Sequence, residues 1–576
     1  MLAAGPRGGG AGEPREPTEL GRVVTLPPLM VEGKNAPVRW RYLELPGLEV
    51  LSVCDDYTVE KFVHRRHRLN ELLHVLVPER FCAQSSVPVA HILFNEATGR
   101  AQSQEIIREM VRKEGAFLAP DGTVFLPYSD QTTPTFGRLP AISAPPRISF
   151  LPNIRLSDLD ATTVFAIVSE TNPPKFTFTP DEVEFSLKRR TPALPDWFVE
   201  GLLGLYRQAE LRDDEVVVRP ATWPSDPAAA ALLRGTKQSP TLLPMQELLT
   251  RARPGDDQEI GETDRVWQSQ CALFLRWALA DKSGARKEAL WQFVDRLEAE
   301  PLSEALFQKH FGLGFSEARD RLGEYLPAAL NKDLMLDAPS TVPLPRLKFR
   351  AATDLEVARI RGDWERMEIA YVRQQYPALT GKYVEQARRT LHRVYDRGER
   401  DPRLLAILGL TEVDAGNPDG AREFLEAAVR GQVVRPRVYF ELAQLRYKAL
   451  PAAGDAKLTD EQAAGVLGPL LAAHSDNPPL PGIYALLAEV WKHSATPPTP
   501  ENLKILNEGA RLFPGMSAYV LCAIYLNVAN GQVTPAAALA NLGLRHARDP
   551  AMRERLERVR EKLAMIKELV DQVPDR

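Results

Sequence analysis

One carboxylate in this sequence stands in a setting that is typical of a metal ligand. Glu200 lies in the segment Trp-Phe-Val-Glu-Gly-Leu, with Trp197 before it and Gly201 and Leu202 after it. We expect a helix to begin after Pro195. A carboxylate on such a helix completes a zinc site when an earlier helix supplies two histidines at positions i and i+4. A glutamate between those histidines then serves as the general base of a metal-assisted hydrolysis.

The segments around Glu200 resemble the zinc metallopeptidases of the gluzincin, or peptidase MA-like, type. In that family a segment close to PxWxxEGLA begins a helix downstream of HExxH: the acid binds zinc, the glycine allows close packing, and the tryptophan seats the helix in the core. Segments 267–279 (WQSQCALFLRWAL) and 307–326 (FQKHFGLGFSEARDRLGEYL) resemble the family's later helices, in the same order. The resemblance covers roughly residues 40–330. It implies an α+β domain with few strands and many helices.

The histidines and the general base that the resemblance requires are missing. No histidine stands between His91 and His310. The segment 156–168 (LSDLDATTVFAIV), in which we expect a buried helix, precedes the Glu200 helix and is where the motif belongs. The residues at the places of His, Glu and His are Asp160, Ala161 and Val164. The resemblance therefore implies a degenerate site with no catalytic residue, no metal ligand and no cofactor, in which Trp197, Glu200 and Gly201 are a remnant.

Two other sets of residues carry part of a metal-binding pattern. Asn70–His74 (NELLH) differs from HExxH in its first residue, but Glu71 precedes Glu200 by 200 − 71 = 129 positions. His64, His67 and His74 lie along the flank of the same helix, where interleaved arginines repel a cation. We interpret both sets as ordinary residues of an amphipathic helix. The alternative is a zinc metallopeptidase with a non-standard ligand set that includes Glu200 and these histidines.

Other catalytic and binding signatures are absent from the sequence. It has no GxGxxG, Walker, GxSxG or EF-hand motif. The acidic pairs Asp55-Asp56 and Asp213-Asp214 read as turn residues. The four cysteines form no CxxC pair and are interpreted as small apolar residues.

Length and charge limit the architecture and the partners. A chain of 576 residues is too long to fold around a single hydrophobic core, and its length predicts two or three domains. A net charge of −4, without a basic stripe, gives no reason to expect nucleic acid, and no apolar run is long enough for direct membrane insertion. Residues 1–38 are predicted to be disordered or extended and contain no signal-peptide core. We expect a cytoplasmic protein as the sequence stands; a start codon further upstream would permit an exported, periplasmic one.

The elements expected in the N-terminal domain, 39–335, include a hairpin with a turn at Pro46-Gly47 and a helix capped by Asp56. The apolar positions of that helix recur at a period of 3.6 residues, from Val59 to Leu76. A strand at 87–94, a helix at 103–115 and a strand at 122–128 follow. Between 240 and 326 the pattern is helical.

A repeat of 34 residues marks the C-terminal region. Ala387 matches Ala421, Asp401-Pro402 matches Arg435-Pro436, and Leu408-Gly409 matches Leu442-Ala443, each at this period. The repeat resembles the tetratricopeptide (TPR) repeat and predicts an all-helical array over 365–576, after a linker at 336–364. Stacked repeats present an extended surface. We therefore expect a non-catalytic protein that binds a protein or peptide through the array, or scaffolds an assembly.

Overall fold

The computed structural model describes residues 39–82, 85–95, 163–168, 183–184, 187, 190–212, 215–224, 242–254, 261–338, 346–375, 377–450, 457–547 and 549–571. The predictions made for 1–38, for the helix at 103–115, for the strand at 122–128 and for the turn at Asp213-Asp214 lie outside these residues.

A five-stranded sheet forms the N-terminal part of the fold. Its strands are β1 (Arg41–Leu45), β2 (Leu48–Ser52), β3 (Val89–Asn95), β4 (Thr163–Val168) and β8 (Arg350–Ala351), in the order β4-β3-β2-β1-β8. The hairpin of β1 and β2 is confirmed, with Gly47 at a φ of 71° in the turn. That φ favours glycine, which has no Cβ to clash with the backbone. Strand β3 confirms the prediction for 87–94 and pairs in parallel with both β2 and β4.

The helix predicted at 156–168 is wrong for the part that the structure describes. Residues 163–168 form β4, which pairs with β3 along its whole length. The run contains the β-branched residues Thr163, Val164, Ile167 and Val168, which favour strands. A short apolar run does not distinguish a buried strand from a buried helix by periodicity alone, and pairing with β3 decides this case.

Helix α1 (Asp56–Leu76) covers one face of the sheet. The predicted apolar face is confirmed, because every residue of that face is buried: Val59, Phe62, Val63, Leu69, Leu72, Leu73 and Leu76. The predicted cap is corrected by one residue. The Asp55 side chain, not that of Asp56, accepts a hydrogen bond from the Thr58 N–H at 2.7 Å.

A group of helices shares the core of α1. It comprises α4 (Asp196–Gln208), α6 (Met245–Thr250), α7 (Glu262–Leu279), α8 (Ala285–Leu297), α9 (Glu304–Phe311) and α10 (Phe315–Asn331). A small antiparallel sheet, β5 (Ala209–Leu211), β6 (Glu215–Val218) and β7 (Leu334–Asp337), adjoins them. On α7, the Trp267 indole donates to the Leu248 carbonyl at 3.0 Å, and the Gln270 amide bonds both backbone groups of Leu243. These bonds fix α6 and its approach segment on α7.

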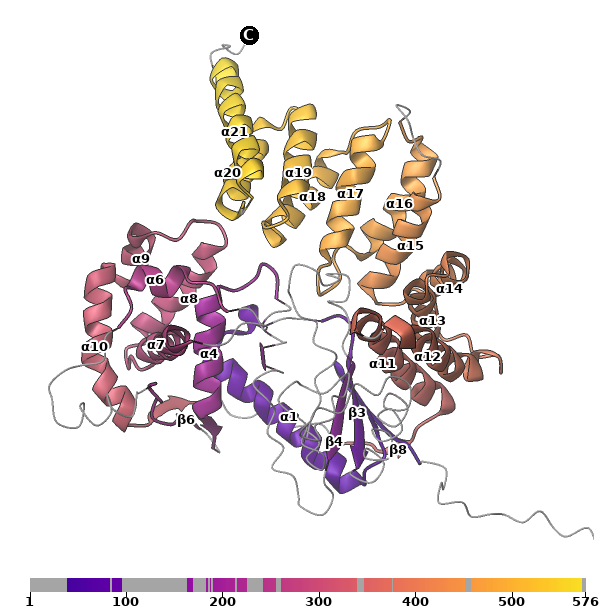
Figure 1. The fold of residues 1–576 in the computed structure, drawn as a ribbon, viewed down its shortest axis with the longest axis horizontal. Helices are drawn as coiled ribbons and strands as arrows, with labels where there is room; N and C mark the ends of the chain where they lie inside the picture. Colours follow the sequence, from indigo (N-terminus) through magenta and orange to yellow (C-terminus); the bar gives the residue numbers. More distant parts are fainter. Residues whose placement is uncertain are drawn as a thin grey trace, which may run out of the picture. The chain divides into compact units, whose positions relative to one another are not determined.

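The segment 336–364, which we expect to be a linker, contains regular elements. It contains the end of β7, all of β8 and half of helix α11 (Asp354–Gln375). Val357, Ile360 and Trp364 of α11 lie buried against Leu51 and Ile92 of the sheet. Helices α11 and α12 (Thr380–Tyr395) thus cover the face of the sheet opposite α1 (Figure 1). Alternate residues of a strand point to opposite faces, so β2 and β3 contribute to both cores.

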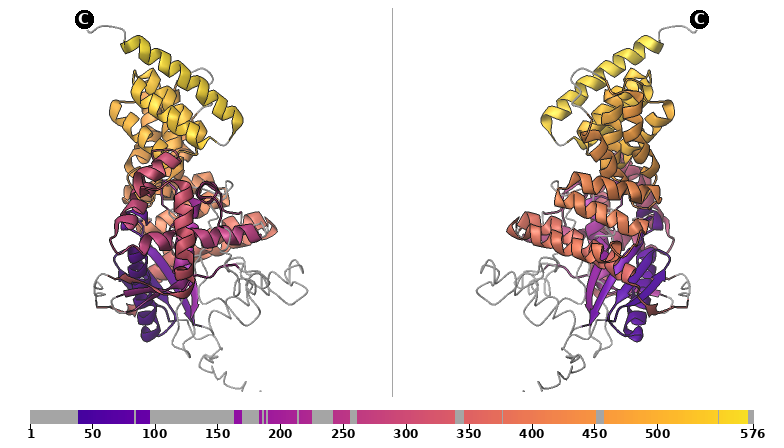
Figure 2. Two further views of the ribbon diagram at one scale, coloured as in Figure 1. Left: turned by 90° about the vertical axis from the view of Figure 1, so that its left-hand side faces the viewer. Right: turned by 90° about the vertical axis from the view of Figure 1, so that its right-hand side faces the viewer.

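The C-terminal region is helical, as predicted. Its helices are α13 (Pro402–Ala415), α14 (Pro418–Arg430), α15 (Pro436–Lys448), α16 (Asp460–Ala473), α17 (Pro481–His493), α18 (Pro500–Leu512), α19 (Ser517–Ala529), α20 (Val533–His546) and α21 (Pro550–Asp571). Short 3₁₀ turns lie at Glu79–Phe81 and Pro377–Leu379. Helix α21 packs on α20 at the end of the array (Figure 2). In the described part of the chain, no helix is both long and apolar enough to cross a membrane.

The 34-residue period corresponds to a repeated packing geometry. Pro402 and Pro436 are the first residues of α13 and α15, a position that tolerates the missing N–H of proline. Ala387 of α12 and Ala421 of α14 are both fully buried. A Cβ on Gly409 would lie 2.6 Å from the Leu425 side chain, so glycine allows α13 and α14 to touch. The matched small residues therefore lie at helix contacts.

A buried ion-pair network crosses the first helices of the array. Arg366 of α11 and Arg437 of α15 each contact Asp414 of α13 at 3.1 Å, and all three side chains are at most 1% exposed. Asp363 of α11 accepts from Arg366 at 3.0 Å and from Arg435 at 3.1 and 3.2 Å. Asp414 thus joins arginines of α11 and α15, and Asp363 joins Arg366 to the residue that caps α15, which fixes how the helices align.

Candidate functional site

The residues of the WxxEGL segment all lie in the buried first half of α4. Pro195 is the cap residue. The side chains of Trp197, Glu200 and Leu202 are each at most 1% exposed, and Gly201 is buried. The Trp197 ring packs against Phe274 of α7 and Phe293 of α8, with ring centroids 5.5 and 6.3 Å apart. Trp197 therefore anchors α4 in the helical core.

Glycine is required where α4 meets α7. A Cβ on Gly201 would lie 2.7 Å from the Cys271 carbonyl oxygen and 2.9 Å from the Leu275 side chain. One turn further along, a Cβ on Gly204 would lie 2.6 Å from the Ala272 Cβ. The two helices therefore approach each other more closely than any larger residue permits.

We predict opposite effects for alanine at two helical glycines. Gly201→Ala forces α4 and α7 apart and is expected to lower the free energy of unfolding by about 1–3 kcal/mol. Gly465→Ala, in α16, meets no atom within 4 Å and is expected to raise it by about 0.5–1 kcal/mol through helix propensity. Urea unfolding of the full chain measures both. A stabilising Gly201→Ala would contradict the contact geometry.

An arginine occupies the neighbourhood of the Glu200 carboxylate. The Arg253 Nε lies 3.0 Å from Glu200 Oε1, and the same guanidinium donates to both carboxylate oxygens of Glu184, one of them at 3.2 Å. The Arg253 backbone N–H donates to Asp196 at the start of α4, at 3.1 Å. Arg253 thus bridges two carboxylates that come from separate segments of the chain.

This arrangement supplies Glu200 with a cation from the protein itself. Glu200 is 1% exposed, and a buried carboxylate is costly unless it is paired. The thiol of Cys271 lies beside it: burial, reinforced by the charge of Glu200, raises the pKa of Cys271 well above its ordinary value. A protonated, buried thiol is a poor nucleophile. The site therefore holds a buried ion pair beside an inert cysteine.

Of the other sequence-predicted site residues, those that the structure describes lie on elements other than α4. Val164 lies in β4, and Asp160 and Ala161 lie outside the described residues. His64 and His67 lie on α1, where they contact Glu60 at 3.7 Å and Glu71 at 3.2 Å on the same helix. These contacts are ordinary i,i+4 pairs of a helix surface.

Sequence reasoning missed Arg253, the partner of Glu200, and Glu184, the second carboxylate that Arg253 contacts. Val183 and Glu184 are helical, and they stand before the WxxEGL segment in a stretch for which the sequence pattern predicts no element. Arg253 lies in a loop after α6, 53 residues beyond Glu200, and no motif marks it. Among the described residues, no group of three or more His, Cys, Asp or Glu side chains is arranged to hold a metal ion.

His91 is a second buried titratable group of the domain. It lies in β3, fully buried, with its ring centroid 5.1 Å from that of Phe62. Within the described residues neither ring nitrogen has a hydrogen-bond partner. Burial, with the charge of Arg66, holds the pKa of His91 well below its ordinary value.

Because the folded state keeps His91 neutral, we predict an acid-sensitive stability. The unfolded chain takes up a proton near pH 6.5 and the folded chain does not, so stability falls as the pH drops below about 6.5. This histidine contributes a slope of up to about 1.4 kcal/mol per pH unit. His91→Leu is expected to make the pH dependence between 7.5 and 5.5 shallower in urea unfolding. An unchanged slope would show that His91 titrates alike in both states.

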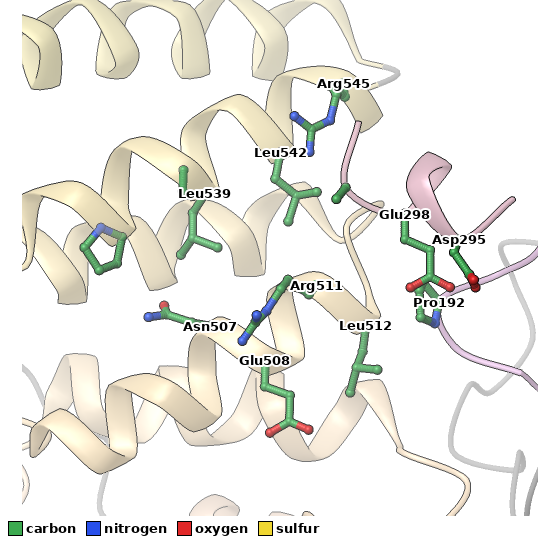
Figure 3. A pocket seen from close by; sticks show the side chains of 13 residues that line it. Pro192, Asp295, Glu298, Asn507, Glu508, Arg511, Leu512, Leu539, Leu542 and Arg545 are labelled. Atoms are coloured by element: carbon green, nitrogen blue, oxygen red, sulfur yellow. The ribbon is translucent and has the colours of Figure 1, made fainter. Parts of the chain in front are cut away.

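Helices α18 and α20 form one wall of a cavity, whose lining also includes Pro192, Asp295 and Glu298. Figure 3 shows Leu512, Leu539 and Leu542 on this wall, with the side chains of Arg511 and Arg545 beside them. Burial lowers the pKa of Arg545 from its ordinary value, and the charge of Glu300 acts in the opposite direction. An apolar surface next to arginines is a composition that protein interfaces favour.

Comparison of the chain with known protein families, with curated proteins and with solved structures finds no match. Function is therefore inferred from the residues and their geometry.

Proposed function

We propose that this chain is a non-catalytic protein that binds a protein or peptide partner through its helical array. In this proposal the N-terminal domain is a peptidase-like domain of the gluzincin type that has lost its metal site. The array is a set of TPR-like repeats. The observation that carries the proposal is the pairing of Glu200 with Arg253.

The pairing supports a non-catalytic role because of what zinc binding would demand. A zinc ligand needs its lone pairs directed at the metal, and a guanidinium at 3.0 Å competes for them. Arg253 also carries a fixed positive charge, which repels a second cation. Glu200, the residue that would complete a metal site, is thus paired with the positive charge of Arg253.

The array supports the binding role. Its matched positions, Pro402 with Pro436 and Ala387 with Ala421, recur at 34 residues and lie at equivalent places in alternate helices. Such stacks expose a continuous surface that binds extended or helical segments. The wall formed by α18 and α20 places the exposed side chains of Arg511 and Arg545 on that surface, beside the buried Leu539 and Leu542.

Two measurements test the two halves of the proposal. Zinc content after equilibration and gel filtration is expected to be well below one ion per chain. One zinc ion per chain, lost on Glu200→Gln, would instead establish the metallopeptidase alternative.

For binding, partners are cross-linked to the full wild-type chain and to a double variant in which Arg511→Glu and Arg545→Glu reverse both charges. The sets of cross-linked partners are then compared. Loss of a partner is expected for this variant. The matched control reverses Arg558 and Arg560, which are exposed on α21, and is expected to retain it. Equal retention in both variants would place the partner elsewhere.

A further inference from the structure

A small charged cavity lies where the sheet meets the first helices of the array. It has a volume of about 60 Å³. Its walls include Glu49 of β2, Arg359 and Asp363 of α11, Arg403 of α13, and the residue that caps α15, Arg435. A water molecule needs only about 10–15 Å³ measured in this way, so the cavity has room for a small ion.

The two carboxylates of the cavity are already used by the protein. Glu49 accepts from the Tyr42 hydroxyl at 2.6 Å and from Arg359 through both of its oxygens, one bond being 2.9 Å long. Asp363 accepts from Arg366 and from both terminal nitrogens of Arg435. Burial alone would raise the pKa of Glu49, but Arg359 outweighs it and the pKa is lowered. Both acids are therefore ionised and saturated with donors.

Arg403 differs from the other two arginines of the cavity. Its side chain is 47% exposed, and its ion pairs are long: 3.4 Å to Glu49 and 3.8 Å to Asp401. Asp401 offsets part of the charge, but its carboxylate caps α13 by accepting from the N–H groups of Arg403 and Leu404. Arg403 thus makes only a long hydrogen bond to Glu49, and its half-exposed guanidinium presents further donors at the cavity mouth.

The start of α15 adds to the positive potential. Arg435 is its cap residue and makes no side-chain capping hydrogen bond. The amino end of a helix carries a partial positive charge, which attracts anions when it is uncapped. Val433 and Val434 give the same region an apolar edge. Three arginines, one of them just before α15, therefore line the cavity together with two carboxylates that already accept from arginines.

We propose that this cavity binds one small oxyanion, a carboxylate or phosphate group, with Arg403 as its direct contact. Arg359 and Arg435 hold the cavity open through their pairs with Glu49 and Asp363. The proposal goes beyond the proposed function, because it requires no protein partner and can hold or fail independently of partner binding.

The test uses the full chain with two probes, sodium acetate and sodium phosphate, at constant ionic strength. A bound anion stabilises the folded state, so the Tm is expected to rise and saturate as the probe is added. Arg403→Gln is expected to weaken the affinity about tenfold, since it removes a charged hydrogen bond. The anion affinity of Arg403→Lys is expected to lie between that of the wild type and that of Arg403→Gln. Saturation with acetate only assigns a carboxylate, and saturation with phosphate only assigns a phosphate.

The control is Arg393→Gln, an exposed arginine of α12 outside the cavity, which is expected to match the wild type. Arg403 is exposed, so its replacement should change stability without a probe by less than about 1 kcal/mol. If Arg403→Gln nevertheless fails to fold, Arg403→Lys tests the proposal instead, again by whether its anion affinity is lower than that of the wild type. A Tm that does not saturate in the wild type, or that rises equally in the Arg403 variants, overturns the proposal.

Discussion

Replacement of Asp414 by alanine is expected to lower the free energy of unfolding by about 3–5 kcal/mol. The carboxylate is 1% exposed and contacts Arg366 and Arg437, each at 3.1 Å. Removing it leaves two buried guanidinium groups short of negative charge. Asp414→Asn keeps an acceptor but not the charge. Its free energy of unfolding is expected to lie between those of the wild type and Asp414→Ala. Urea unfolding at pH 7 measures the loss.

An exposed ion pair of the same array provides the control for Asp414. Asp354 contacts Arg397 at 2.7 Å, and both side chains are more than 60% exposed. Asp354→Ala is expected to change stability by at most about 1 kcal/mol, because solvent already screens the pair. Similar losses for Asp354→Ala and Asp414→Ala would mean that burial does not govern the strength of these pairs.

Replacement of Arg253 by alanine is expected to lower the free energy of unfolding by about 3 kcal/mol, because Glu200 is then a buried charge without its cation. The second substitution Glu200→Gln removes that charge and should restore part of the loss. A double-mutant cycle over Arg253 and Glu200 gives the coupling between them.

Arg251 is the matched control for Arg253. It lies two residues earlier, has a similar exposure of 27%, and pairs with Glu247 and Asp264, both of which are more exposed than Glu200. Arg251→Ala is expected to cost no more than about 1 kcal/mol. If the Arg253–Glu200 coupling were near zero, Arg253 would not be the cation of this site, and the case against a metal at Glu200 would lose its basis.

The sequence predicted the elements whose pattern is local. The apolar face of α1, the Pro46-Gly47 hairpin and the proline that begins each of α13 and α15 follow from periodicity and turn chemistry. Segment 163–168 could not be assigned in this way, because its strand conformation depends on pairing with β3, more than 60 residues earlier.

The candidate site was predictable only on α4. Trp197, Glu200 and Gly201 lie close together in the sequence, and their burial follows from the WxxEGL pattern. Arg253 is brought to Glu200 by the fold of a loop, which no spacing rule encodes. The buried ion-pair network was missed for the opposite reason. Charged residues on a helix normally read as a solvated face, and only stacking of α11, α13 and α15 turns Asp414 inward.

Division of the chain at 335–345 would separate residues that share a core. Tyr42, Leu51 and Ile92 of the sheet pack against α11 and α12. A fragment that ends at residue 335 therefore exposes an apolar sheet face and is expected to aggregate. Binding experiments consequently use the full chain with point substitutions.

The packing of α11 and α12 also determines which recombined chains can fold. Leu391 of α12 fits against Gly362 of α11, where a Cβ would lie 2.4 Å from it, so this pair moves as one piece. The same pair contributes Ala358 and Leu391 to the core of the array and Val357 and Ile360 to the core of the sheet. A graft that gives this sheet a different array must therefore retain residues 346–395. The viable crossover point lies after α12, inside the repeats.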